Sequence, residues 1–119
     1  MKTILISDPD TDLLDIMCTA LEMGGFRAIG FQDLSADLMG LIKYYQPDVV
    51  FLDYAYADRQ CIESCSLIKS LYNFLPVLAV SCNHNIAETF TDSGFDDCIS
   101  KPFNLDDLYA MANKYTNMI

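Results

Sequence analysis

Residues 48–53, Asp48-Val49-Val50-Phe51-Leu52-Asp53, contain a continuous apolar run rich in β-branched residues, 49–52, which is followed by the carboxylate of Asp53. The run has the length of a strand, and apolar and polar side chains do not alternate within it. Uninterrupted apolar strands are typical of parallel sheets, in which helices cover both faces. The sequence therefore predicts a buried parallel strand over 48–53, with Asp53 at its carboxyl end.

Strand-like and helix-like segments alternate on both sides of this run. The other predicted strands cover residues 3–7, 26–31, 76–81 and 95–100. The predicted helices follow Asp8, then cover residues 34–45, 59–73 and 85–93, and the last one starts after Asn104 and runs to the end of the chain. Five strand–helix units in succession predict an α/β fold with three layers, a doubly wound five-stranded parallel sheet between helices.

Residues that start and stop helices support these boundaries. Pro9 is suited to the first turn of the first helix, which Gly24-Gly25 ends. Asp58 and Asn104 are plausible N-caps of the third and fifth helices.

The composition indicates one folded domain, residues 1–119, without a second one. About half of the residues, 52%, are hydrophobic, which is enough for a core. No apolar run approaches the roughly 18 residues of a membrane span, and Asp8 comes too early for a signal peptide. We therefore expect a cytoplasmic protein without membrane insertion.

The net charge of −10 argues against a nucleic-acid ligand, because the seven basic residues are scattered and form no stripe. The five cysteines are an odd number in a chain without a signal peptide, which favours reduced thiols over disulfides. Cys61 and Cys65 are spaced to share a metal ion on a helix, but with His84 as the single histidine a zinc site would lack ligands.

Polar side chains stand where four of the predicted strands end: Asp8, Asp53, Ser81 and Lys101. In open parallel sheets, sites form at the carboxyl ends of the strands. Each residue alone is weak evidence, since such positions often hold a cap or a solvated side chain. Together, two carboxylates, a hydroxyl and an ammonium form a coherent set for handling a phosphoryl group.

The chemistry of this set is that of a carboxylate nucleophile. Asp53 could attack phosphorus and hold an acyl phosphate. Mg²⁺ usually binds one or two carboxylates and keeps several waters, which suits Asp8 and Asp53, and it would offset repulsion between Asp53 and the incoming oxygens. Lys101 and Ser81 could contact those oxygens.

Four segments give the chain a resemblance to a known family: residues 4–8, 47–53, 76–81 and 94–103, the last reading Gly-Phe-Asp-Asp-Cys-Ile-Ser-Lys-Pro-Phe. In order and at this spacing, over nearly the whole chain, they resemble the receiver domains of two-component response regulators. The resemblance implies a flavodoxin-like sheet with strand order 2-1-3-4-5. It also implies a signalling switch rather than an enzyme.

The resemblance further implies a role for each matching residue. Asp53 matches the phosphoacceptor, Asp8 an acidic residue near the metal, Ser81 the switch hydroxyl and Lys101 the lysine that contacts the phosphoryl group. Ala55 stands where the family offers a backbone carbonyl to Mg²⁺. The implied partners are a histidine kinase or phosphotransfer protein as donor, and a downstream protein on the face of the fourth helix, fifth strand and fifth helix.

Several positions depart from the family pattern. Pro9 replaces the second acidic residue, for which Asp10 is an uncertain substitute as a metal ligand. Ala57 stands at the position of a proline, and Cys98 replaces the aromatic switch residue. Met111 stands where a large DNA-binding subfamily has an arginine that supports dimerisation.

Two other functions stay open at this point. One is a pseudo-receiver, an interaction module whose Mg²⁺ binding and phosphorylation are impaired by Pro9. The other, a small flavodoxin-like enzyme or flavin carrier, is disfavoured because the acidic Asp8-Pro9-Asp10 would repel a phosphate in the absence of a metal ion. Since the chain ends soon after the last predicted helix, we expect no output domain.

Overall fold

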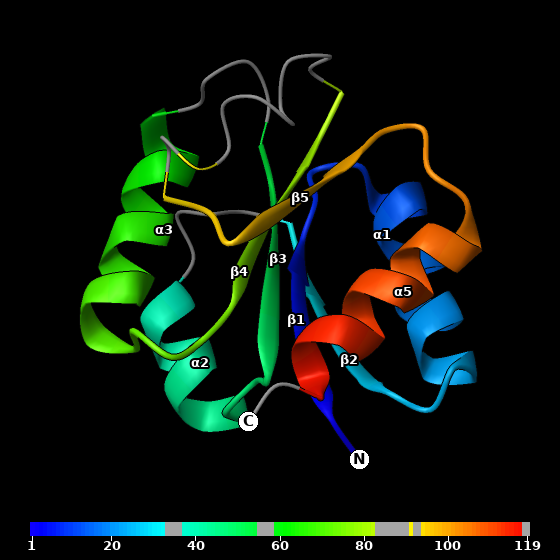
Figure 1. Ribbon diagram of the computed structural model, residues 1–119, viewed down its shortest axis with the longest axis horizontal. Helices are drawn as coiled ribbons and strands as arrows, with labels where there is room; N and C mark the ends of the chain where they lie inside the picture. Colours follow the sequence, from blue (N-terminus) through cyan, green and yellow to red (C-terminus); the bar gives the residue numbers. More distant parts are fainter. Residues whose placement is uncertain (33–36, 55–58, 83–90, 92–93, 118–119) are drawn as a thin grey trace.

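The computed structural model describes residues 1–32, 37–54, 59–82, 91 and 94–117 (Figure 1). Its five strands are β1 (Thr3–Ser7), β2 (Arg27–Phe31), β3 (Val49–Asp53), β4 (Val77–Ser81) and β5 (Asp97–Ser100). All pair in parallel, in the order β2-β1-β3-β4-β5. The predicted fold class and strand order are confirmed, and β2 to β5 begin one or two residues later than predicted.

Four helices are described: α1 (Thr11–Met23), α2 (Leu38–Tyr45), α3 (Arg59–Leu71) and α5 (Leu105–Thr116). Asn104 caps α5 as predicted, since its side chain accepts a hydrogen bond from the backbone N–H of Asp107 at 2.8 Å. The helix predicted at 85–93, the N-cap role of Asp58 and the start of the helix predicted at 34–45 lie outside the described residues.

Helix α1 begins later than predicted, and the placement of Pro9 in its first turn was wrong. Asp10 is the N-cap, with an extended backbone (φ −83°, ψ 107°), and its carboxylate accepts hydrogen bonds from the N–H groups of Asp12 and Leu13. Aspartate stabilises a helix start because it satisfies N–H groups that have no partner within the helix. This cap therefore leaves Pro9 in front of the helix.

Gly24 and Gly25 end α1, as predicted, for two different reasons. Gly25 has a φ of +93°, which side chains with a Cβ rarely adopt. Gly24 lies against α5, where a Cβ would stand 2.8 Å from Cε1 of Tyr109. The hydroxyl of Tyr109 donates to the carbonyl of Ala20 at 2.8 Å, so α1 and α5 are joined at this point.

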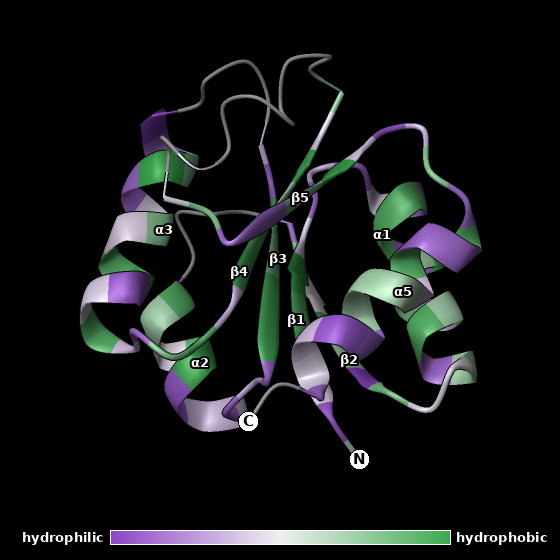
Figure 2. Ribbon diagram, in the orientation of Figure 1, coloured by the Kyte–Doolittle hydropathy of each residue, from purple (hydrophilic) through white to green (hydrophobic). Residues whose placement is uncertain are grey.

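The sheet lies between two helical layers, with α1 and α5 on one face and α2 and α3 on the other (Figure 1). Each face has its own buried cluster, and alternate strand residues join opposite clusters. Phe51 of β3, for example, packs with the α1–α5 cluster, and Leu52 packs with the α2–α3 cluster. Figure 2 shows the resulting apolar stretch along the middle of β1, β3 and β4.

Cys61 and Cys65 are buried in the α2–α3 cluster, and the five cysteines are free thiols. The thiol of Cys65 donates to the carbonyl of Gly94 at 3.5 Å. Burial, and secondarily the charge of Asp96, raises the pKa of Cys65 to about 11. These two thiols therefore pack as small apolar side chains. Among the described helices, none is both long and apolar enough to span a membrane.

Candidate functional site

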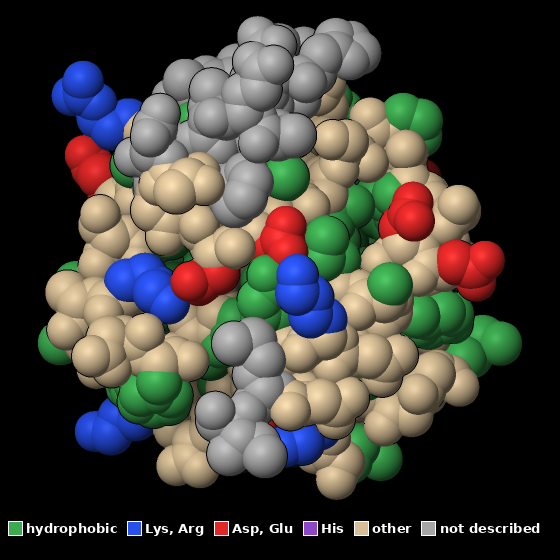
Figure 3. Space-filling view, viewed as in Figure 1, with side chains coloured by type: hydrophobic (Ala, Val, Ile, Leu, Met, Phe, Trp, Pro, Cys, Tyr) green, Lys and Arg blue, Asp and Glu red, His purple; other side chains and the backbone are tan. Residues whose placement is uncertain are grey.

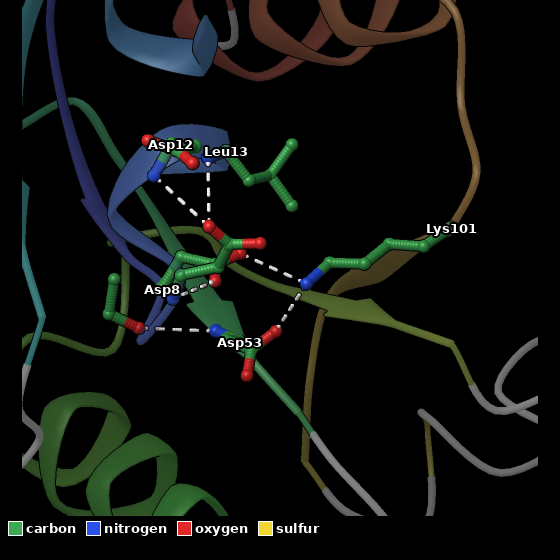
Figure 4. A network of polar contacts seen from close by, with 7 residues as sticks. Asp8, Asp12, Leu13, Asp53 and Lys101 are labelled. Atoms are coloured by element: carbon green, nitrogen blue, oxygen red, sulfur yellow. Dashed lines mark hydrogen bonds and ion pairs between the residues drawn. The ribbon is translucent and has the colours of Figure 1, made fainter. Parts of the chain in front are cut away.

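Charged side chains from the ends of three strands lie close together at the carboxyl edge of the sheet (Figure 4). Asp8 directly follows β1, Asp53 is the last residue of β3, and Lys101 directly follows β5. The backbone holds these ends in register: the N–H of Asp8 donates to the carbonyl of Phe31 at 3.2 Å, and that of Lys101 to the carbonyl of Ser81 at 2.7 Å. The charged groups therefore meet because parallel strands end at the same edge.

The ammonium group of Lys101 bridges the two carboxylates. Its Nζ lies 2.9 Å from Oδ2 of Asp8 and 2.7 Å from Oδ1 of Asp53. The side chains of Lys101 and Asp53 are each 15% exposed, and that of Asp8 is 2% exposed. Two largely buried negative groups therefore share one positive group, and the cluster keeps a net negative charge that favours a cation.

The pKa of Lys101 reports this arrangement. Burial by itself lowers the pKa of the ammonium, but its hydrogen bonds to Asp53 and Asp8, and then their charges, outweigh burial and raise the pKa above its ordinary value. Lys101 is therefore fully protonated at neutral pH and available as a positive charge.

Asp8 is held from a second direction. Its Oδ1 accepts a hydrogen bond from the backbone N–H of Asp10 at 2.9 Å, while its Oδ2 accepts from Lys101. The carboxylate of Asp10 itself lies at the start of α1, where its Oδ1 accepts hydrogen bonds from the backbone N–H groups of Asp12 at 3.0 Å and Leu13 at 3.3 Å. Asp10 therefore fixes the loop that carries Asp8, and whether it also reaches a metal ion stays a prediction.

Ser7 belongs to the site, although the sequence reasoning gave it no role. Its hydroxyl oxygen accepts a hydrogen bond from the backbone N–H of Asp53 at 3.1 Å. Ser7 is buried at the carboxyl end of β1, one residue before Asp8. The sequence signal that could have indicated Ser7 is its position: it is a polar residue at the end of an apolar strand, directly before Asp8.

Ser81 is buried at the end of β4, the strand between β3 and β5. Asp53 pairs in register with Val80, and Ser81 pairs with Ser100, so Ser81 lies one step beyond Asp53 and one step before Lys101 along the edge. The structure thus brings Asp8, Asp53 and Lys101 into direct contact and places Ser81 on the neighbouring strand end. The backbone carbonyl of Ala55, and Ala57, lie outside the described residues.

The oxygen atoms of this site fit a magnesium ion. Mg²⁺ prefers carboxylate oxygens and takes one or two of them, with waters and phosphate oxygens as the remaining ligands. In the part of the chain that the structure describes, no group of three or more His, Cys, Asp and Glu side chains gathers as a metal site. Asp8 and Asp53, whose carboxylates both contact Lys101, could supply such oxygens.

Cys98 and Met111 lie on the β5–α5 side of the molecule. Both are partly buried, and both line a hollow of about 440 Å³ with Pro102 and Lys114. Burial, and secondarily Asp97, raises the pKa of the Cys98 thiol, so this thiol stays protonated at neutral pH.

The protein-family model described as the response regulator receiver domain matches residues 4–113 of this chain. The chain belongs to the response regulator receiver domain family. Receiver domains act in two-component signalling, where they interact with kinases and downstream effectors, and they are generally not enzymes. They generally bind Mg²⁺ at the phosphorylation site.

Curated relatives agree with this assignment. The receiver domain is 29% identical over 109 residues to response regulator MprA of Mycobacterium sp. strain KMS. It is 31% identical over 109 residues to the nisin biosynthesis regulatory protein NisR of Lactococcus lactis subsp. lactis. Each match covers 90% of this chain and 47% of the relative, so the chain spans about half the length of these relatives.

Solved structures show the same fold. The receiver domain of NtrX from Brucella abortus superposes with a TM-score of 0.84 at 26% identity, covering 98% of this chain and 99% of that one. The chemotaxis response regulator CheY4 of Vibrio cholerae superposes with a TM-score of 0.83, covering 97% of this chain and 98% of that one. At 18% identity, this second likeness concerns the fold alone.

Proposed function

We propose that this receiver domain accepts a phosphoryl group on Asp53 from a histidine kinase or a phosphotransfer protein, and that the modification changes its binding to a downstream protein. The observation that carries the proposal is the bridge from Lys101 to both Asp8 and Asp53, at 2.9 and 2.7 Å, at the carboxyl edge of the sheet. A family whose members interact with kinases supplies the donor class.

In the proposed transfer, an oxygen of Asp53 forms a bond to phosphorus while the bond between phosphorus and the donor's histidine nitrogen breaks. The electron pair of that bond goes to the nitrogen. Mg²⁺ supplies positive charge that offsets the repulsion between anionic groups. The carboxylates of Asp8 and Asp53 would hold it.

The protein's own groups position the reaction. Lys101 holds Asp53 before transfer and would pair with a phosphoryl oxygen after it. Ser7 fixes the backbone N–H of Asp53. Ser81, on the adjacent strand end, is the hydroxyl that we assign to the phosphoryl group in the modified state.

The proposed consequence is a shift between two states of the domain, because a new dianionic group and its partners stabilise one arrangement of the strand ends over the other. We assign the downstream partner to the side that contains β5 and α5, with the segment between β4 and β5. The cytoplasm, where response regulators usually act, is the compartment that fits such partners.

Phosphorylation of the wild-type domain beside Asp53→Asn tests the proposal. The domain is incubated with Mg²⁺ and a small acyl-phosphate donor, or with a histidine kinase, and its intact mass is measured. We expect the mass of one added phosphoryl group on the wild type and none on Asp53→Asn. An unmodified wild type with every donor, together with amide NMR shifts that do not respond to beryllofluoride, would contradict the proposal.

That negative outcome is the one that the pseudo-receiver alternative expects. The observation in its favour is local: Pro9 provides no carboxylate, and the Asp10 carboxylate caps α1. An added phosphoryl group on Asp53 in the presence of Mg²⁺ would remove this alternative.

A further inference from the structure

Two hollows join at the end of the sheet opposite the acidic site. One, of about 270 Å³, reaches Lys2 and Tyr115, and the other, of about 320 Å³, reaches Ile42 and Tyr72. Both hollows are lined by Pro47, Asp48, Phe74 and Leu75. We call the two hollows together the amino-end groove, because they lie at the starts of the strands. The side chain of Phe74 is 79% exposed although it lines both hollows.

Exposed apolar side chains are frequent at this end of the sheet. Eight large hydrophobic side chains are exposed among the described residues, and five of them lie at the amino end of the sheet. These five either precede β1, follow α3 or belong to the last turns of α1, α2 and α3: Met1, Met23, Tyr44, Leu71 and Phe74. An exposed apolar area of this kind marks an interaction surface.

The charge of the same end differs from that of the whole domain. Five of the seven basic residues lie there, at strand starts or in the last turns of helices: Lys2, Arg27, Lys43, Lys69 and Lys114. Four described carboxylates accompany them: Glu22, Asp48, Asp96 and Asp97. On the face in Figure 3, basic side chains reach the lower end of the molecule, where Figure 1 places the strand starts.

This end is therefore close to electrically neutral, whereas the domain as a whole carries −10. The excess negative charge lies toward the carboxyl edge, around Asp8, Asp53 and the first turns of α1 and α5. Two copies repel each other least when these acidic edges point apart. Of the two ends of the described sheet, the amino end is then the one that two copies can bring together symmetrically without joining their acidic edges.

We propose that the amino end is a symmetric homodimer interface, in which Phe74 of each copy enters the amino-end groove of the other. The sizes allow this, because a volume of about 150 Å³ holds a benzene ring and each hollow is larger than that. A two-fold axis places the protruding ring of one copy against the proline-lined hollow of the other, and the two rings beside each other.

The size of the surface fits as well. A standard interface buries about 800 Å² on each partner. The domain measures 32 × 30 × 29 Å, so one end of it offers an area of that order. The two acidic edges lie at opposite ends of the dimer, many times the screening length of about 8 Å apart. Both sites stay open to donors, so the dimer does not depend on the proposed phosphorylation.

Sedimentation velocity of the chain from micromolar to millimolar concentration tests the interface. We expect a monomer–dimer equilibrium that stops at the dimer. Phe74→Asp should weaken it at least about tenfold, which corresponds to about 1.4 kcal/mol. The matched control is Ile16→Asp on α1, which also introduces a charge at an exposed apolar position, 58% exposed, away from the groove.

Salt distinguishes this dimer from head-to-tail association of the acidic edge with the basic residues. Screening weakens repulsion between two copies of charge −10, so the symmetric dimer should become more populated as NaCl rises. A chain that is monomeric at all concentrations, a dimer that Phe74→Asp leaves unchanged, weakening by salt, or growth beyond the dimer would each overturn the proposal. Circular dichroism of both variants checks that they remain folded.

Discussion

At the residue scale, the position of Asp53 depends on neighbours at the ends of two other strands. Lys101 contacts its oxygen from the end of β5, and Ser7 binds its backbone N–H from the end of β1. The pairing of β1 with β3 runs from Ile4 to Ile6 on the β1 side, and the Ser7 side chain extends it by one hydrogen bond. The Ser7 hydroxyl therefore helps to fix the position of Asp53, in addition to the strand pairing of the sheet.

Replacing Ser7 by Ala should show how far Asp53 relies on this bond. The loss of one hydrogen bond to a buried backbone group should lower the free energy of unfolding by about 1–2 kcal/mol. Without this bond the Asp53 carboxylate is less well aligned for attack on phosphorus. The rate of phosphorylation at saturating donor should therefore fall about tenfold. Denaturant unfolding and donor titration measure the two effects.

Ser7→Thr is the matched control, since it keeps the hydroxyl on the strand. It should recover most of both losses. If Ser7→Ala changes stability but leaves the rate constant of phosphorylation intact, Ser7 is a structural residue and has no positioning role.

At the scale of the element, α1 is coupled to the site by its cap. Asp10 accepts hydrogen bonds from the first turn of the helix through its carboxylate and donates to Asp8 through its backbone N–H. Asp10 therefore both starts the helix and orients the carboxylate of Asp8. A change in the cap is expected to affect both.

The variants Asp10→Ala and Asp10→Asn separate capping from metal binding. Alanine removes the cap and should lower the free energy of unfolding by about 1 kcal/mol, whereas asparagine caps about as well as aspartate. If Asp10 acts only as a cap, Asp10→Asn should bind Mg²⁺ with the affinity of the wild type in an NMR titration. A clear loss of affinity in Asp10→Asn, without loss of stability, would instead assign Asp10 to the metal site.

At the scale of the whole molecule, charge is distributed unevenly between the two ends of the sheet. The carboxyl edge carries the site and most of the negative excess, and the amino end carries five of the seven basic residues. Such a field attracts cations to the site and keeps anions away until a cation is bound.

Salts should therefore stabilise the domain in two distinguishable ways. NaCl should raise the thermal midpoint by screening self-repulsion. MgCl₂ at equal ionic strength should raise it further, because an ion that binds only the folded state adds stability. The additional rise of the thermal midpoint in MgCl₂ should disappear in the Asp8→Asn variant. Equal midpoints in the two salts, measured by calorimetry at one low protein concentration, would speak against a magnesium site.

The order of the described elements, the parallel sheet and the four charged or polar strand ends could be predicted from the sequence. These features depend on local signals, such as the apolar run over 49–52 or the capping side chain of Asn104. The start of α1 was predicted wrongly, because Pro9 and Asp10 both carry signals for a helix start. The helix begins after Asp10 because the Asp10 carboxylate accepts hydrogen bonds from the first turn, a contact that the sequence does not show.

By itself the sequence determined which residues stand at the carboxyl edge of the sheet, because hydrophobic periodicity and turn residues act over a few positions. Only the tertiary structure decided that Lys101 lies between Asp8, 93 positions away, and Asp53, 48 positions away. It also decided that Ser7 holds Asp53, and that exposed apolar and basic side chains meet at the opposite end. The physical reason is that such contacts are set by strand register and helix packing, which join segments that are distant along the chain.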